Sequence, residues 1–281
     1  MARGPGRLLL AVAVGWGAAC AAGEKGPVRF VVYGGTEGSG PHHRAVAAQV
    51  AKLRPELVLH CGGLVADPAR PEAWQAFEAF TAPVFESAPF YACRGREDVS
   101  VFAKGKVRPE GVSWGGTTYY SFDHRGLHFV ALDSALRVTA KDPQTEWLRK
   151  DLEAAEGKRI FVLLCRPIYT VAGKPHHRRA EMFWSPLFAR HGVTAVFSGE
   201  HHIYYRTEAK GVTYVVTGGG GAPLDEVRDR RGLLDGDVAG AFYHCIEVVA
   251  GEERVRARVV DSEGRTRDEF FIPPSSRGAG P

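Results

Sequence analysis

Three titratable side chains follow one another directly after a short apolar run in this sequence. The stretch FSGEHHIYYR (residues 197–206) comes after the run 193–196, and Glu200, His201 and His202 stand where the predicted strand ends. Carboxylates and imidazoles are common ligands of zinc and other transition metals. The stretch therefore indicates a metal site, or the remains of one.

Glycine marks the ends of most of the other strands that the sequence predicts. Apolar runs at 28–33, 57–59, 90–93, 160–164 and 194–197 alternate with helical periodicity at 43–53, 72–80, 142–157 and 181–190. The five strand ends read Gly34-Gly35, Gly62-Gly63, Gly95-Arg96, Cys165-Arg166 and Gly199-Glu200. In α/β folds, ligands bind beyond the carboxyl ends of parallel strands, so these ends mark the expected site.

These strand ends, in this order, resemble those of the calcineurin-like metallophosphoesterases, particularly the branch near the purple acid phosphatases. LVLHCGGLVAD resembles LVLHTGDLVAD, FVLLCRPIYT resembles a strand ending in H-x-P-x-Y, and FSGEHHIYYR resembles FSGHDHIYER. GTTYYSFDHRGLHFVALDS, QTEWLRKDL and VTYVVTGGGGAPL also look like family blocks. The resemblance covers residues 28 to about 272. It implies a four-layer α/β/β/α sandwich with two mixed sheets.

At the metal positions this sequence departs from the family. The first motif's Asp is Gly35, and the metal-bridging Asp of the second motif is Gly63. The family's reaction needs two bridged cations that polarise the phosphate and activate a water molecule. Glycine has no side chain and supplies neither carboxylate, so the resemblance implies that a dinuclear centre is lost.

The remaining three motifs depart as well. Arg96 replaces an Asn and Glu97 the catalytic His, while Cys165 replaces the fourth motif's His and Glu200 the first His of the fifth, so that only His202 keeps its type. Arg96 brings a fixed positive charge that repels a metal. One alternative remains open, a weak phosphoesterase with a single divalent metal at Cys165, Glu200 and His202, although no fourth ligand is obvious.

The replacements also suggest a metal-free site for an anion. The candidate ligand-binding residues at these strand ends are Arg94, Arg96, Arg166 and His202. Arginine forks suit phosphate. The alternative is that the arginines pair with nearby acids, and we expect Arg96 to pair with Glu200 or Glu97 in the vacated space. The leading hypothesis is thus a pseudo-phosphoesterase that binds a phosphate-like anion or a protein partner, without a cofactor.

The composition of the chain and its first residues bear on nucleic-acid binding and on export. The chain has 281 residues, 44% hydrophobic content and a formal net charge of +4, with no long Lys/Arg block, which argues against nucleic-acid binding. A basic start, an apolar stretch at 8–14 and small residues to 22 predict a secretory signal. Ala18-Ala19-Cys20 resembles a bacterial lipobox with a lipidated Cys20, whereas Ala19-x-Ala21 suits an ordinary signal peptidase. Either cleavage predicts export to the periplasm or cell envelope.

The expected organisation is a signal peptide at 1–20, a linker at 21–27, one metallophosphoesterase-like domain at 28–272 and a disordered tail at 273–281. Cys61 and Cys93 each lie two residues before a glycine at a strand end. A disulfide bond between them and two separate buried thiols remain the alternatives.

Overall fold

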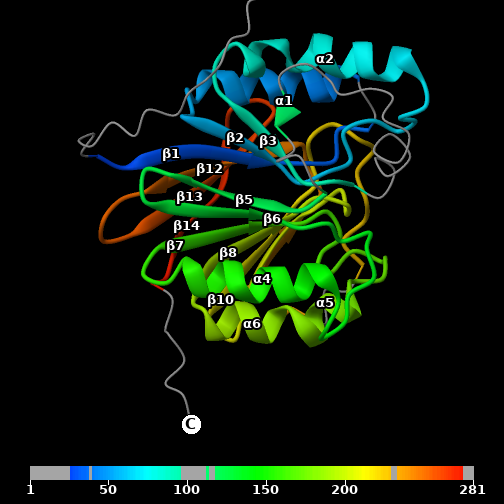
Figure 1. Cartoon of the computed structure of the whole chain (residues 1–281). Helices are drawn as coiled ribbons and strands as arrows, with labels where there is room; N and C mark the ends of the chain where they lie inside the picture. Colours follow the sequence, from blue (N-terminus) through cyan, green and yellow to red (C-terminus); the bar gives the residue numbers. More distant parts are fainter. Residues whose placement is uncertain (1–25, 38–39, 96–111, 114–117, 229–232, 275–281) are drawn as a thin grey trace, which may run out of the picture.

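Two β-sheets pack face to face with helices outside each of them. A computed structural model describes residues 26–37, 40–95, 112–113, 118–228 and 233–274. Figure 1 shows α1 and α2 above the first sheet and α4, α5 and α6 below the second. These are the four α/β/β/α layers that the resemblance implied.

Sheet A joins the first and last strands of the chain. In the described residues its order is β14-β13-β12-β1-β2-β3-β4. Strands β1 to β4 run parallel, and β12, β13 and β14 pair antiparallel. The bounds are β1 Val28–Tyr33, β2 Leu57–His60, β3 Phe90–Ala92, β4 Val112–Ser113, β12 His244–Ala250, β13 Val255–Asp261 and β14 Thr266–Ile272.

Sheet B is built from the middle of the chain. Its order in the same residues is β11-β9-β10-β8-β7-β6-β5. Strands β6, β7, β8 and β10 run parallel, and β5, β9 and β11 pair antiparallel at the two sides. The bounds are β5 Tyr120–His124, β6 Leu127–Ala131, β7 Arg159–Leu163, β8 Val193–Ser198, β9 Tyr204–Ala209, β10 Val212–Thr217 and β11 Val238–Gly240.

The alternation of side chains along β1 explains why helices cover the outer face of sheet A. Phe30 points between the sheets and meets Phe129 of sheet B at 5.3 Å and Phe161 at 5.0 Å between ring centroids. Val31 and Tyr33 point the other way and pack among residues of α1 and α2. Both faces of this strand are apolar, as expected for a strand buried on two sides.

Five helices fill the outer layers of the described chain. They are α1 Pro41–Lys52 and α2 Pro71–Phe85 on sheet A, and α4 Pro143–Ala154, α5 Arg178–Phe183 and α6 Ser185–Arg190 on sheet B. Asp142 caps the N-terminus of α4 and accepts a hydrogen bond from the Thr145 amide at 3.0 Å. The single helix predicted at 181–190 is wrong. Pro186 lies in the first turn of α6, and since proline cannot donate an amide hydrogen bond, the helix breaks into two.

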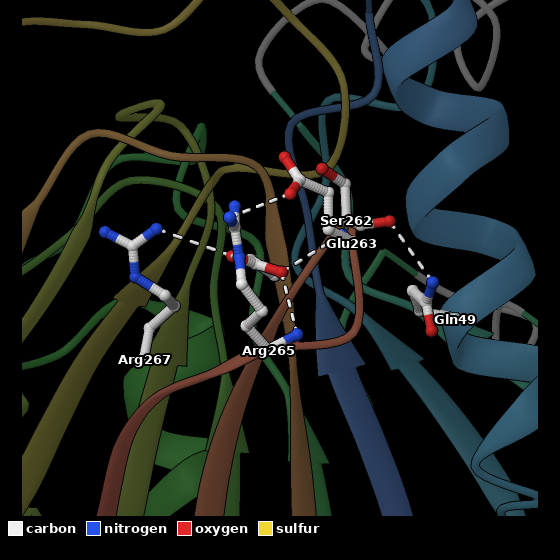
Figure 2. A network of polar contacts seen from close by, with 6 residues as sticks. Gln49, Ser262, Glu263, Arg265 and Arg267 are labelled. Atoms are coloured by element: carbon white, nitrogen blue, oxygen red, sulfur yellow. Dashed lines mark hydrogen bonds and ion pairs between the residues drawn. The ribbon is translucent and has the colours of Figure 1, made fainter.

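A polar network fixes the turn between β13 and β14 to α1. The buried carboxylate of Asp261 accepts hydrogen bonds from the amides of Glu263 and Arg265 and from the Arg265 guanidinium. Burial raises the pKa of Asp261, but these donors outweigh it, and the pKa is lowered. Figure 2 shows this network and the Gln49 side chain of α1, whose Nε2 donates to the Ser262 carbonyl at 3.2 Å. The hairpin tip is therefore held to the helix layer.

Two expectations fall partly or wholly outside the described residues. The signal peptide with Cys20 lies outside them, as do residues 275–281 of the tail. Within the described part of the chain, no helix is long and apolar enough to cross a membrane.

His128, which is remote from the candidate site, should make the free energy of unfolding depend on pH. His128 of β6 is buried, with Nδ1 at 2.7 Å from Asp123 Oδ1 and Nε2 at 2.9 Å from Asp151 Oδ2. Burial lowers the pKa of His128, but the bonds to Asp151 and Asp123 outweigh it, and the pKa is raised. The stability that His128 contributes is therefore present below its unfolded-state pKa and is lost as pH rises through the folded-state value.

We expect His128→Gln to reduce the free energy of unfolding by about 1–2 kcal/mol at pH 6 and by clearly less at pH 9. Urea unfolding at both pH values measures this difference. A loss that is equal at the two pH values would show that the imidazole acts only through its shape and neutral hydrogen bonds.

Candidate functional site

The carboxyl ends of the parallel strands from both sheets meet at one edge of the sandwich. The Thr36 amide donates to the Gly63 carbonyl at 2.8 Å, and the Gly199 amide donates to the Cys165 carbonyl at 3.0 Å. The Gly95 amide also lies against Gly62. All five predicted strand ends therefore contribute to this edge, although Arg96 and Glu97 themselves lie outside the described residues.

A pocket of about 360 Å³ opens at this edge. Its lining residues are Glu37, Gly63, Cys165, Arg166, Lys174, Pro175, Glu200, His201 and His202. A smaller pocket of about 140 Å³ adjoins it and shares Cys165, Arg166 and Glu200, with Ser134 and Ala135 as additional lining. Most of the side chains that line the larger pocket are titratable, and its volume lies in the lower range of small-molecule sites.

Gly35 allows the end of β1 to approach a neighbouring loop closely. Its φ is +70°, and a Cβ at this position would overlap the backbone oxygen of Gly218 and lie 2.9 Å from the His202 ring. The loop is held there, since the Gly220 amide donates to the Gly34 carbonyl at 2.8 Å. An aspartate at position 35 does not fit without a backbone shift.

The space beside Gly63 is filled by a carboxylate from another strand end. Gly63 has a φ of +67°, and a Cβ on it would overlap Glu37 Oε1 and lie 2.7 Å from Glu37 Cδ. Glu37 stands two residues after Gly35, in the loop that follows β1. Its side chain thus occupies the place toward which the side chain of residue 63 would project.

Glu37 pairs with His202, the residue whose type matches the resemblance. His202 Nδ1 lies 2.9 Å from the Pro223 carbonyl, which can only accept, so Nδ1 carries a proton. His202 Nε2 lies 3.3 Å from Glu37 Oε2, an ion-pair distance without the alignment of a hydrogen bond. Burial lowers the pKa of His202, but the proximity of Glu37 outweighs it, and the pKa is raised. The imidazole is therefore stabilised in its protonated form.

A loop after β10 fixes the position of His202 from the other side. Asp225 Oδ2 accepts the His202 amide at 2.9 Å, and the same oxygen lies 2.7 Å from Lys174 Nζ. One carboxylate therefore links the backbone of His202 to a lysine of the pocket rim. Sequence reasoning missed Lys174, Asp225 and the role of Glu37, because no motif connects these loops.

Comparisons with known proteins agree with this geometry. No family model matches the chain. The sequence is 32% identical to mouse tartrate-resistant acid phosphatase type 5 over 144 residues, which cover 48% of this chain and 43% of that protein. It is 27% identical to Purple acid phosphatase 18 of Arabidopsis thaliana over 151 residues, covering 48% of this chain and 35% of the relative. The chain thus spans less than half the length of these curated relatives.

Solved structures share the fold over most of the chain. A purple acid phosphatase from yellow lupin (Lupinus luteus) seeds superposes with a TM-score of 0.75 at 18% identity, covering 90% of this chain and 55% of that one. This chain has the calcineurin-like metallophosphoesterase fold, and its sequence is similar to those of purple acid phosphatases. GAP50 of Plasmodium has the same fold, with a TM-score of 0.71 at 14% identity and coverage of 90% and 91%.

The donor atoms of this chain do not fit the dinuclear metal centre that the resemblance implies. Gly35 and Gly63 supply no carboxylate, and neither position has free space for one. Cys165, Glu200 and His202 line one pocket, yet among the described residues no group of three or more His, Cys, Asp or Glu side chains is placed to hold a metal ion. The alternative one-metal set is therefore brought to the same pocket but not into a ligand cluster.

The predicted arginines have separate environments. Arg94 is buried in an ion pair with Asp133 and is not among the residues that line the pocket, and its assignment as a ligand-binding residue stays a prediction. Arg166 lines both pockets, donates from Nη2 to the Pro175 carbonyl at 3.4 Å and makes no ion pair with a described residue. The expected pairing of Arg96 lies outside the described residues. The ion pair seen beside the emptied metal positions is that of Glu37 and His202.

The described cysteines and His201 are buried in the protein interior. The four described cysteines, Cys61, Cys93, Cys165 and Cys245, are buried and form no disulfide bond with one another, so Cys61 and Cys93 are separate thiols. His201 is buried, and its Nδ1 lies 2.9 Å from Thr170 Oγ1. Burial, with Lys174 as the next cause, lowers the pKa of His201 to about 4, so this side chain is neutral near pH 7.

Proposed function

We propose that this chain is an exported pseudo-phosphoesterase that binds a small anion without metal at the carboxyl edge of its sheets. The observation that carries the proposal is the Glu37 side chain, which fills the space beside Gly63 and forms an ion pair with His202. A carboxylate and an imidazolium then compensate each other where the family places metal ligands. The buried charges are paired without a cation, and the cost of leaving them isolated is avoided.

Arg166 supplies the attraction for an anion. Its guanidinium lines the pocket, has no acidic partner among the described residues and presents planar donors that suit phosphate or carboxylate oxygens. Lys174 adds a second cation at the rim, although it shares its charge with Asp225. This anion-binding role is favoured over a protein-binding role because the two cations line a pocket whose volume, about 360 Å³, suits a small molecule.

The relatives supply a precedent for a role other than catalysis on this fold. GAP50 is described as the anchor in the inner membrane complex of Plasmodium. For the present chain we further propose export through the signal at 1–20, with Cys20 as a lipid-attachment site at the cell envelope.

Binding can be measured with ethyl phosphate as the probe, by calorimetry in the presence of a chelator. We expect saturable binding, no release of inorganic phosphate, and affinity that falls at least about tenfold in Arg166→Ala, because a charge-assisted hydrogen bond contributes about 1.5–3 kcal/mol. Arg70→Ala is the matched control, since that arginine is exposed, directly precedes α2 and does not line the pocket, and its loss should leave the affinity unchanged.

Two results would contradict the proposal. The first is an absence of binding at millimolar ethyl phosphate. The second is metal-dependent hydrolysis of phosphate esters with one metal equivalent bound and lost in His202→Ala, which would establish the alternative enzyme with a one-metal site at Cys165, Glu200 and His202.

A further inference from the structure

Two of the three positively charged side chains in the described lining of the larger pocket already have a carboxylate partner. Lys174 Nζ lies 2.7 Å from Asp225 Oδ2, and His202 Nε2 lies 3.3 Å from Glu37 Oε2. Arg166 is the third, and it makes no ion pair with a described residue. Within the described part of the chain, the lining therefore offers one positive charge that no carboxylate compensates.

The pair of His202 and Glu37 adds no net positive charge in either protonation state of the imidazole. With the imidazole protonated the pair is neutral, and with the imidazole neutral the pair carries the charge of Glu37. Asp225 likewise compensates the charge of Lys174, and it is held in place because its Oδ2 also accepts the His202 amide at 2.9 Å. The count of one uncompensated cation therefore does not depend on the protonation of His202.

This charge balance limits how much negative charge the pocket can bind. Arg166 compensates the first negative charge of an anion, and its planar donors suit an oxyanion. A second negative charge meets no uncompensated cation in the described lining and shares the pocket with the carboxylates of Glu37 and Glu200. Repulsion between two like charges a few ångströms apart exceeds the thermal energy several times at the effective dielectric constant of a protein surface.

We propose that the pocket selects a singly charged oxyanion over a doubly charged one, and that Asp225 sets this preference. The ligand is then a sulfate monoester or a phosphodiester, each with one negative charge, and not a phosphate monoester, which carries close to two near neutral pH. The inference rests on the proposed anion-binding function and adds the charge of the ligand. Asp225 acts through Lys174, because it withholds that cation from a second negative charge.

A matched pair of probes tests the preference without any variant. Ethyl sulfate and ethyl phosphate have nearly the same shape and differ by one negative charge at pH 8. We expect ethyl sulfate to bind the wild-type protein at least about tenfold more tightly, because the second charge of ethyl phosphate is uncompensated. Calorimetry in the presence of a chelator measures both dissociation constants. Ethyl phosphate still binds, since Arg166 attracts both anions.

The variant Asp225→Asn should reduce the preference. Asparagine keeps a carbonyl oxygen that can accept the His202 amide, but it removes the charge beside Lys174, whose ammonium then compensates the second charge of ethyl phosphate. The ratio of the two dissociation constants should therefore fall below about threefold. Because both probes are measured on the same variant, a change in pocket shape that weakens both equally leaves the ratio unchanged.

Glu226→Gln is the matched control. It removes one negative charge from the next residue of the same loop, but Glu226 is exposed, pairs with Arg228 and does not line the pocket, so the wild-type ratio should persist. Equal or tighter binding of ethyl phosphate by the wild-type protein would overturn the preference while leaving anion binding intact. An unchanged ratio in Asp225→Asn would overturn the role of Asp225, and an absence of binding by both probes would overturn the proposed function itself.

Sulfate monoesters and phosphodiesters share the single charge and differ in the number of their substituents. Arg166 lines both the larger pocket and the adjoining pocket of about 140 Å³, so a diester bound to it has room for a second substituent. Diethyl phosphate, measured beside ethyl sulfate, distinguishes the two sources. Tighter binding of diethyl phosphate supports a diester that extends into both pockets, and tighter binding of ethyl sulfate supports a sulfate monoester.

Discussion

Near pH 5 the protein is expected to lose most of its stability. Five buried histidines have folded-state pKa values far below the ordinary value of 6.5: about 3 for His60 and about 4 for His43, His177, His201 and His244. Burial is the largest cause for each. In the unfolded chain the same imidazoles take up protons below pH 6.5, so acid favours unfolding.

The direction and size of this loss of stability follow from the linkage between proton binding and folding. Stability from these neutral histidines is fully present above pH 6.5 and is lost as pH falls toward the folded-state pKa values. Each contributes about 1–2 kcal/mol of loss at pH 5, and five together approach the whole stability of an ordinary domain, about 5–15 kcal/mol. His128 and His202 have raised pKa values and therefore gain stability in acid, but these two contributions are fewer than the five that are lost.

Urea unfolding at pH 7.5, 6 and 5 measures the loss, and two adjacent residues provide the matched test. His43 is buried against Thr81, with Nε2 at 3.2 Å from Thr81 Oγ1, whereas His42 is exposed and stacked on Tyr243. His43→Gln should make the free energy of unfolding fall less steeply with acid, and His42→Gln should leave the slope unchanged. Stability that stays level down to pH 4.5 would show that the buried imidazoles are reached by water or share protons.

The second large effect is expected at Gly35. We predict that Gly35→Asp destabilises the protein by about 3 kcal/mol or more, because the obstacle is the backbone of Gly218 and the local chain is braced by hydrogen bonds. Gly63→Asp should cost only about 1 kcal/mol beyond charge repulsion, since its obstacle is the flexible end of Glu37. Both glycines have positive φ, so that part of the strain is common to them.

Chemical denaturation of both variants measures the contrast, and Gly35→Ala beside Gly63→Ala separates the steric cost from the new charge. With alanine, too, the substitution at position 35 should lower the free energy of unfolding more than the substitution at position 63. If the two alanine variants lose equal stability, the close approach of Gly218 to Gly35 does not constrain the site.

The strands that the sequence predicted are those with continuous apolar runs that end at glycine. The run at 28–33 is β1 in full, and 57–59 and 90–93 fall within one residue of β2 and β3. Strand β12 was missed because His244, Cys245 and Glu247 interrupt its pattern. Each is accommodated by tertiary contacts, as when Arg258 Nη2 approaches the buried Glu247 carboxylate at 2.8 Å.

The location of the site could be predicted, but its contents could not. The strand ends fixed the edge, and the losses at Gly35 and Gly63 were readable from the resemblance alone. The ion pair between His202 and Glu37 could not be predicted. Glu37 reaches His202 from the loop after β1, and its side chain occupies space that the glycines at positions 35 and 63 leave open. The Lys174–Asp225 contact joins loops after different strands, so no spacing in the sequence encodes it.

The pairing of β1 with β12 has a consequence for the time at which this chain folds. Val28 is in register with Ala250, so a central strand of sheet A gains its second neighbour 222 residues later in synthesis. During translation β1 has only β2 as a paired neighbour, and its other edge stays open until the C-terminal strands emerge. Such long-range closure is slow and leaves the nascent chain exposed to aggregation. Sheet A therefore stays incomplete until synthesis is nearly finished, which is compatible with the export proposed above.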